Sequence, residues 1–165
     1  LGHPAWLEQD EWLGSSMTKQ YPLQLISGQP NNRLHSQLDN GSESQKHKIS
    51  GREAIKINPK DAYLRNLKNG DIVEVFNKRG KCLAGITISK EVMQGVVFLP
   101  VGAWYDPIDD GGFCIHGNPN VLTADIGTSS LSQGPSAHST LVEVKKFVKE
   151  LPELNVFKKP PTNIK

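Results

Sequence analysis

Short apolar segments that alternate with polar residues recur along the chain and predict a mainly β fold. Strands are predicted at residues 23–27, 54–57, 71–76, 81–89, 96–101 and 140–148, with a four-residue hairpin turn at 77–80. Both faces of the two strands around this turn carry apolar residues, so we expect both faces to be covered. Turn signals at intervals of about eight to twelve residues favour a compact closed barrel. Long crossovers suggest psi-type connections, but the strand pattern leaves the topology open.

One helix is predicted directly after the second strand. Asn58 can cap its first turn, and Pro59 suits the first helical position. The spacing of Leu64 and Leu67 continues the helix to a stop at Asn69, which is followed by glycine.

The other segments predict loops and a division of the chain into three parts. We expect 31–41 to be a loop with one helical turn, and 43–48 to be an exposed, mobile loop. Residues 1–20 are interpreted as a linker, 21–150 as the barrel domain, and 151–165 as an extended tail.

Composition narrows the function classes. The 165 residues carry a formal net charge of +2 and are 36% hydrophobic, which argues against a disordered chain and against a strongly basic nucleic-acid binder. Apolar runs fall short of the about 18 residues that a membrane-spanning helix needs. The isolated Cys82 and Cys114 are expected to stay reduced, although a disulfide remains open.

The most informative feature is a set of three polar loops, each after a strand, at 27–37, 102–106 and 116–134. Glycines permit close backbone approach, and amide and hydroxyl groups both donate and accept, which suits a polar heterocycle with phosphates. Arg33 could pair with a phosphate, and Asp125 could accept two hydrogen bonds from the edge of a guanine. Further hydrogen-bonding side chains in these loops are His35, Ser36, Gln37, Asn118, Asn120 and Gln133. The alternative is a solvent-exposed loop in which each residue makes only local turn contacts.

Other chemistries have weaker support. Neither a phosphate-binding Gly-Lys loop nor a Gly-x-Gly-x-x-Gly turn after a strand occurs in the sequence. Cys114 and His116 are two potential zinc ligands without partners nearby in the sequence. His35, Ser36 and Asp39 could be imagined as a hydrolase triad, but neighbours on one loop rarely orient one another.

Several short sequence motifs, which together cover nearly all of residues 1–150, resemble those of one protein family. They lie at 2–6, 11–14, 33–38, 51–53, 58–62, 69–71, 77–80, 102–107 and 116–135. In these motifs, of which Arg33–Leu38 and His116–Thr123 are the most specific, the chain resembles the carboxy-terminal cofactor-binding domain of the dimethyl sulfoxide reductase family of molybdenum enzymes. The residues of these motifs are most similar to those of the trimethylamine N-oxide and biotin sulfoxide reductase branch of this family.

This resemblance implies a six-stranded double-psi β-barrel with one or two short helices and long polar loops. Such a domain would bind and position bis(molybdopterin guanine dinucleotide), the molybdenum cofactor, in a much larger polypeptide. The residues that the resemblance places toward this cofactor are Ser27, Gly28, Arg33, His35, Ser36, Gln37, Gly102, Trp104, Tyr105, His116, Asn118, Asp125, Gln133 and Gly134. The family's metal-ligating serine belongs to the upstream part, so we expect no catalytic residue and no metal ligand here, and an inactive fragment.

The resemblance also implies a parent enzyme that reduces S-oxides or N-oxides, such as trimethylamine N-oxide, biotin sulfoxide or dimethyl sulfoxide, by oxygen-atom transfer. Its partners would be the upstream domains of the same polypeptide, the oxide substrate and an electron-donor protein, without nucleic acid or a membrane span. A bacterial, periplasmic location is favoured over a cytoplasmic one. The alternative function is a free-standing double-psi barrel that acts as a protein-binding adaptor.

Overall fold

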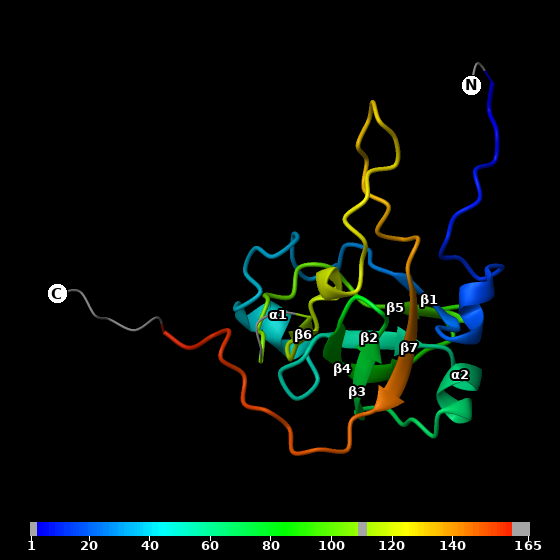
Figure 1. Ribbon diagram of the computed structural model, residues 1–165. Helices are drawn as coiled ribbons and strands as arrows, with labels where there is room; N and C mark the ends of the chain where they lie inside the picture. The colour runs from blue at the N-terminus through cyan, green and yellow to red at the C-terminus, as the bar shows by residue number, and fades with distance from the viewer. Residues whose placement is uncertain (1–2, 109–111, 160–165) are drawn as a thin grey trace.

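The computed structural model describes residues 3–108 and 112–159, and a closed β-barrel forms its centre (Figure 1). Six strands follow one another in the ring order β2-β5-β1-β7-β3-β4, and a pairing of β4 with β2 closes the ring. They are β1 (Leu23–Ile26), β2 (Ala54–Ile57), β3 (Ile72–Phe76), β4 (Lys81–Ile88), β5 (Val96–Phe98) and β7 (Leu141–Lys146). Closure gives each of these strands a partner on both sides, which protects its backbone from pairing with other chains.

Two of the six pairings are parallel, and they identify the topology. β1 runs parallel to β5 and β2 runs parallel to β4, whereas the other four neighbours in the ring are antiparallel. A parallel pair requires a crossover connection, and two such crossovers give the two psi motifs of the barrel. The expected six-stranded double-psi β-barrel is therefore confirmed.

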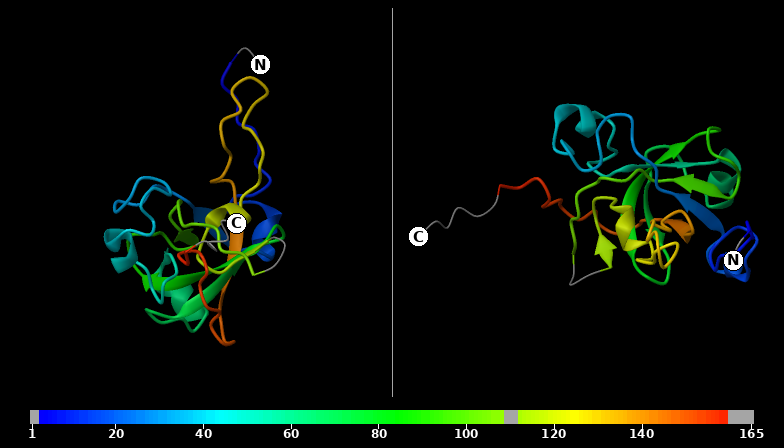
Figure 2. Two further views of the ribbon diagram at one scale, coloured as in Figure 1. Left: turned by 90° about the vertical axis from the view of Figure 1, so that its left-hand side faces the viewer. Right: turned by 90° about the horizontal axis from the view of Figure 1, so that it is seen from above.

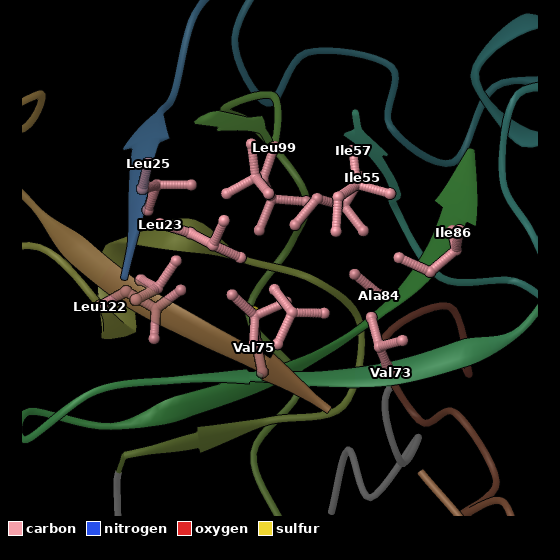
Figure 3. Packing of buried hydrophobic residues seen from close by; sticks show 14 of the residues in the cluster. Leu23, Leu25, Ile55, Ile57, Val73, Val75, Ala84, Ile86, Leu99 and Leu122 are labelled. Atoms are coloured by element: carbon pink, nitrogen blue, oxygen red, sulfur yellow. The ribbon is translucent and has the colours of Figure 1, made fainter. Parts of the chain in front are cut away.

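The barrel interior is filled by apolar side chains that point toward one another from several strands (Figure 3). Leu25, Ile55 and Val73 are fully buried there, as the alternation in their strands predicts. In β4 every residue from 82 to 86 is buried, which confirms that both faces of this strand are covered. The outer face is covered because Ile49 packs directly on Gly85, where a side chain would meet it at 2.3 Å.

Helix α2 (Pro59–Leu64) begins as predicted but ends earlier. The Asn58 side chain accepts the N–H of Lys60 at 3.0 Å and caps the helix. Instead of continuing to Asn69, the helix stops because Asn66 adopts a positive φ of 53°. This turn sends Leu67 into the core and leaves Leu64 exposed, so the apolar spacing there reflects a turn and not a longer helix.

The segment 43–48, predicted as an exposed, mobile loop, is largely helical, and the expected exposure holds for only part of it. Residues Ser42–Lys46 form helix α1, in which Ser44 is buried whereas Glu43 and Lys46 are exposed. The Lys48 side chain is only 1% exposed, because it reaches the buried carboxylates of Asp39 and Glu53. The polar sequence indicated solvent exposure throughout, whereas two of its polar side chains face polar partners inside the protein.

A short seventh strand, β6 (Phe113–Cys114), pairs with β4 outside the ring and was not predicted. Its Cys114 is the parallel register partner of Cys82 on β4. Both thiols are free and buried. The sequence expectation that the two cysteines stay reduced is confirmed, whereas their adjacency on neighbouring strands was not predicted.

The segment before β1 is fastened to the barrel by one buried carboxylate. Glu11 accepts two hydrogen bonds from the guanidinium of Arg79, at 2.5 and 2.8 Å, and one from the backbone N–H of Leu141 at 2.9 Å. After it the 3-10 helix η1 (Ser16–Lys19) leads into β1. Glu11 therefore joins this segment to the β3–β4 hairpin and to the start of β7.

The longest loop, around 123–137, projects from the barrel on the same side as residues 3–10 (Figures 1 and 2). A single bridge between Gly127 and Pro135 narrows it. Of the expected linker and tail, residues 1–2 and 160–165 lie outside the described residues. Within 3–108 and 112–159, no helix combines the length and apolar character needed to cross a membrane.

Candidate functional site

The three polar loops predicted from the sequence meet at one cavity of about 510 Å³. The first loop contributes His35 and Ser36 to its lining, the second contributes residues 101–105, and the third contributes Asn118 and Asn120. This volume lies within the range of small-molecule sites, and the lining mixes aromatic surface with amide, hydroxyl and imidazole groups.

The first two loops touch at the level of their backbones. Gly102 has a φ of +97°, and a side chain there would place its Cβ 1.9 Å from the carbonyl oxygen of His35. Only glycine fits such a crossing. His35 itself has a positive φ of 49°, so both loops adopt uncommon backbone conformations where they form the cavity wall.

A second cavity, of about 480 Å³, adjoins the first. Asn120 lines both, so the two hollows are neighbours at this residue. Thr123, Asp125 and Gln133 contribute polar side chains to the second cavity, which lies within the projecting loop. Polar lining residues therefore extend from the first loop to the projecting loop.

The base of this third loop is rigid. The Asn118 side chain accepts the N–H of Asn120 at 2.9 Å and starts the 3-10 helix η2 (Pro119–Val121). The next residue, Leu122, is fully buried, and its carbonyl accepts hydrogen bonds from the side chains of Asn77 and Arg79. The amide-rich wall is therefore attached to the barrel at Leu122, directly after η2.

Behind the first cavity lies a buried cluster of four charged side chains, Arg33, Asp39, Lys48 and Glu53, each at most 4% exposed. Lys48 Nζ lies 2.9 Å from an oxygen of Asp39 and 3.0 Å from one of Glu53. Arg33 donates to Glu53 at 2.9 Å and also to the carbonyl of Val101 at 2.9 Å. The two positive charges neutralise the two negative ones, and such pairing is what makes the burial of charged side chains tolerable.

This cluster reaches the cavity wall through Asp39. Burial alone would raise the pKa of Asp39, but the hydrogen bond from Lys48 and that from the Trp104 N–H hold it below its usual value. Asp39 thus stays ionised and accepts the Trp104 N–H at 2.9 Å. The charges behind the wall fix the position of an aromatic residue in it.

His116 supports the same wall from the third loop. It is fully buried, and its Nδ1 lies 2.8 Å from the carbonyl oxygen of Trp104. Since a carbonyl only accepts, Nδ1 carries the proton. Burial, and secondarily the charge of Lys48, lower the pKa of His116, so the ring is neutral at pH 7.

The structure brings together only some of the sequence-predicted site residues. Those that line the first cavity are His35, Ser36, Gly102, Trp104, Tyr105 and Asn118. Asp125 and Gln133 line the second. The residues that line neither are Ser27, Gly28, Arg33, Gln37, His116 and Gly134.

The residues outside the two cavities have different surroundings. Ser27 is buried, and its hydroxyl has no hydrogen-bond partner among the described residues. Gly28 accepts the N–H of Val101 and packs against Phe98. Gln37 is exposed, and the carbonyl of Gly134 accepts a hydrogen bond within the projecting loop. The guanidinium of Arg33 is committed to protein partners, so its expected phosphate contact stays a prediction.

Sequence reasoning missed the supporting roles of Asp39, Lys48 and Glu53. Their charges are visible in the sequence, but their burial depends on contacts between segments far apart in the chain. Within residues 3–108 and 112–159, no group of three or more His, Cys, Asp or Glu side chains is arranged to hold a metal ion.

Comparison with known proteins gives a family match over residues 23–141, to the molybdopterin dinucleotide binding domain. A trimethylamine-N-oxide reductase of Haemophilus influenzae is 44% identical over 163 residues, which are 96% of this chain and 20% of that protein. A biotin sulfoxide reductase of Cereibacter sphaeroides is 46% identical over 143 residues, or 87% of this chain and 19% of that protein. The chain spans about a fifth of the length of these relatives.

The fold recurs in acetylene hydratase from Pelobacter acetylenicus. That structure superimposes with a TM-score of 0.70 and 19% identity, covering 87% of this chain and 21% of the hydratase. At this identity the likeness concerns the fold alone.

Proposed function

Because the chain belongs to the molybdopterin dinucleotide binding domain family, we propose that it binds and positions bis(molybdopterin guanine dinucleotide) within a larger molybdenum enzyme. The observation that carries this proposal is the pair of cavities that adjoin at Asn120 and are lined by the three polar loops. Two neighbouring polar cavities suit a ligand in which a heterocycle, a diphosphate and a second heterocycle follow one another.

The residues present fit such a group. Gly102 lines the first cavity, and its missing side chain lets the second loop lie directly against the backbone of His35, which also lines that cavity. Asn118, Asn120, Asp125 and Gln133 supply amide and carboxylate groups along the two cavities, which match the donors and acceptors of a polar heterocycle. Side chains of Trp104 and Tyr105 supply aromatic surface in the first cavity.

Asp125 is the residue we assign to guanine recognition. It lines the second cavity, beyond the shared Asn120. A carboxylate accepts two hydrogen bonds and therefore matches the two adjacent N–H donors on the guanine edge. We place Gln133, on the same cavity, as an additional donor and acceptor. His35, Ser36 and Asn118 would contact the other end of the ligand in the first cavity.

The chain's own contribution is to bind the cofactor, orient it and exclude water; the cofactor supplies the oxygen-atom transfer chemistry. We propose that the parent reduces an S-oxide or N-oxide, as the names of the relatives indicate, and receives electrons from a donor protein. The upstream domains of the same polypeptide complete the active site. The relatives named above are bacterial, and we propose a periplasmic location for the parent.

The test uses the full-length parent, purified from cells that make the cofactor. Molybdenum and the GMP released by acid hydrolysis are measured in the same sample. We expect about two GMP per molybdenum, because each dinucleotide carries one. A well-folded parent that contains neither would overturn the proposal and favour the adaptor alternative.

The guanine assignment has its own test in the parent. Asp125→Asn replaces one of two acceptor oxygens with a donor, and we expect GMP retention to fall by about tenfold. Glu43→Gln is the matched control, since it neutralises an exposed carboxylate on α1, away from both cavities. Equal GMP content in both variants would contradict the role of Asp125.

A further inference from the structure

The segment 152–157, called the strap below, carries no family-like motif, yet it is fastened to the barrel at several points. The guanidinium of Arg52 donates a hydrogen bond to the carbonyl of Pro152. Leu154 lies over Gly51, where a side chain would meet it at 2.6 Å. The strap is therefore placed by specific contacts along its length.

The firmest of these attachments is made by Asp106, which is buried. One oxygen of its carboxylate accepts the backbone N–H groups of both Asn155 and Val156, at 2.7 and 3.0 Å. Hydrogen bonds to an ionised acceptor are about twice as strong as neutral ones. Asp106 directly follows Tyr105 of the first cavity, so the strap is attached to the cavity wall itself.

Beyond this attachment, Phe157 packs against two residues that form and support the wall. Its ring centre lies 5.6 Å from that of Trp104 and 5.0 Å from that of His116, with an edge-on angle of 89° to the imidazole. Such tilted and edge-on pairs are the favourable aromatic geometries. Phe157 thus covers the side of the wall where His116 and Trp104 meet.

Trp104 is the residue through which the strap can act on the cavity. Its N–H donates to Asp39, its indole Nε1 donates to the carbonyl of Ser36 at 2.7 Å, and its carbonyl accepts from His116. Two of these bonds are made by its backbone and one by its side chain, and together they join all three polar loops at one residue. A shift of Trp104 would therefore move several lining groups together.

The contact with Phe157 also bears on the burial of the imidazole. With the proton on Nδ1, the Nε2 of His116 is an acceptor, and it is buried without a hydrogen-bond partner among the described residues. Phe157 packs edge-on against this ring, so the strap contributes to the apolar surroundings of His116.

We propose that the strap is a positioning element of the cofactor site, in which Phe157 and Asp106 hold the Trp104 wall in the shape that accepts the dinucleotide. This inference rests on the proposed function. It assigns to the strap a role in cofactor retention that its sequence does not reveal.

The test compares variants of the full-length parent. Phe157→Ala removes the cover, Phe157→Leu keeps an apolar one, and Asp106→Asn weakens the attachment without changing its shape. Lys158→Ala is the control, because this neighbouring lysine is about half exposed and pairs with a solvent-exposed carboxylate. The readouts are the rate at which GMP and molybdenum are lost from the folded protein during gel filtration, and the melting temperature of the cofactor-free protein.

We expect Phe157→Ala to lose the cofactor about fivefold faster, the factor associated with one aromatic contact pair. Asp106→Asn should lose it about threefold faster, Phe157→Leu should be close to wild type, and Lys158→Ala should equal it. If the melting temperature of the cofactor-free protein falls while the loss rate in the folded fraction is unchanged, the strap is merely structural and the proposal is overturned.

A wild-type parent that contains no GMP would instead be a failure of the proposed function. The rate of amide hydrogen exchange at Trp104 then tests, independently of the cofactor, whether the strap holds this residue in place. Faster exchange in Phe157→Ala than in Lys158→Ala would show that the strap holds the wall, whereas equal exchange would overturn the inference.

Discussion

Lys48 is the most informative residue to change, because it balances two buried carboxylates. Its Nζ lies 2.9 Å from Asp39 and 3.0 Å from Glu53, in a cluster closed to solvent. Lys48→Met keeps the length and apolar character of the side chain and removes only the charge. After the change, Arg33 alone faces the two carboxylates.

The magnitude follows from these distances. At about 3 Å and an effective dielectric constant of about 20, each ion pair contributes about 5.5 kcal/mol of Coulomb energy. Desolvation of the ammonium group offsets much of this sum. Breaking a buried pair from one side typically costs about 3–5 kcal/mol, because the remaining charge is uncompensated. We expect Lys48→Met to lower the free energy of unfolding by this amount.

The assay is urea unfolding of the 165-residue chain. With an m value of about 2 kcal/mol per molar, the midpoint should fall by about 1.5–2.5 M. Lys46→Met is the control: its ammonium is 68% exposed and pairs with an exposed Glu43. Such a surface pair should change the free energy of unfolding by less than about 1 kcal/mol.

The pH dependence gives a second criterion. In the native chain the pKa of Asp39 is lowered, so its stabilisation is present above the unfolded value of 3.8 and is lost as the pH falls through the folded pKa. Without Lys48, burial should raise the pKa of Asp39. In acid Asp39 is then protonated and no longer a buried unpaired charge, so Lys48→Met should lose less stability at pH 4 than at pH 7. A loss below about 1 kcal/mol, or an equal loss at pH 7 and pH 4, would refute the reasoning.

Three further predictions concern other parts of the molecule. Gly102→Ala should weaken cofactor retention in the parent and lower its melting temperature, because the new Cβ would collide with the His35 carbonyl; an unchanged melting temperature would show that the loops can separate. Cys82 and Cys114 should resist alkylation until the chain unfolds, since burial raises the pKa of the Cys82 thiol well above 9.0; labelling of the native chain at pH 8 would contradict this. Burial and a nearby ammonium group lower the pKa of His116, so as the pH falls below 6.5 the imidazole is protonated in the unfolded chain before it is protonated in the folded chain, and the melting temperature should decline. His116→Gln should flatten the dependence of melting temperature on pH in this range. An unaltered slope would show that the imidazole does not cause the decline.

Local sequence signals were sufficient for the six strands of the barrel, whereas their double-psi topology was expected only from the family resemblance. The predicted strand at 54–57 matches β2, and the turn at 77–80 closes as expected with the Asn77 N–H bonded to the Gly80 carbonyl. Alternation predicts such strands because side chains on a strand point to opposite faces. The predicted ends of the strands were less accurate. The strand predicted at 96–101 is β5, which stops at Phe98, although Leu99 beyond it is still fully buried.

The site shows where local signals stop. Asn118 and Asp125 could be identified from their polar loop, and both line a cavity. The burial of Lys48, by contrast, follows from its meeting with Asp39 and Glu53, which are brought together only by the complete fold. Hydrophobic pattern carries no information about polar groups that satisfy one another inside a protein, so the cluster behind the wall was not predictable.

The pairing of β1 with β7 determines when the barrel can close during synthesis of the chain. Leu23 and Gln24 pair with Val142 and Leu141, so the first of the six barrel strands to be synthesised must wait for the last. β3 also needs β7, through Val75 and Val144. Until then both strands present unpaired backbone, which invites association with other chains. Chains whose synthesis stops before β7 would therefore be prone to aggregate, and chaperones should matter most during this interval.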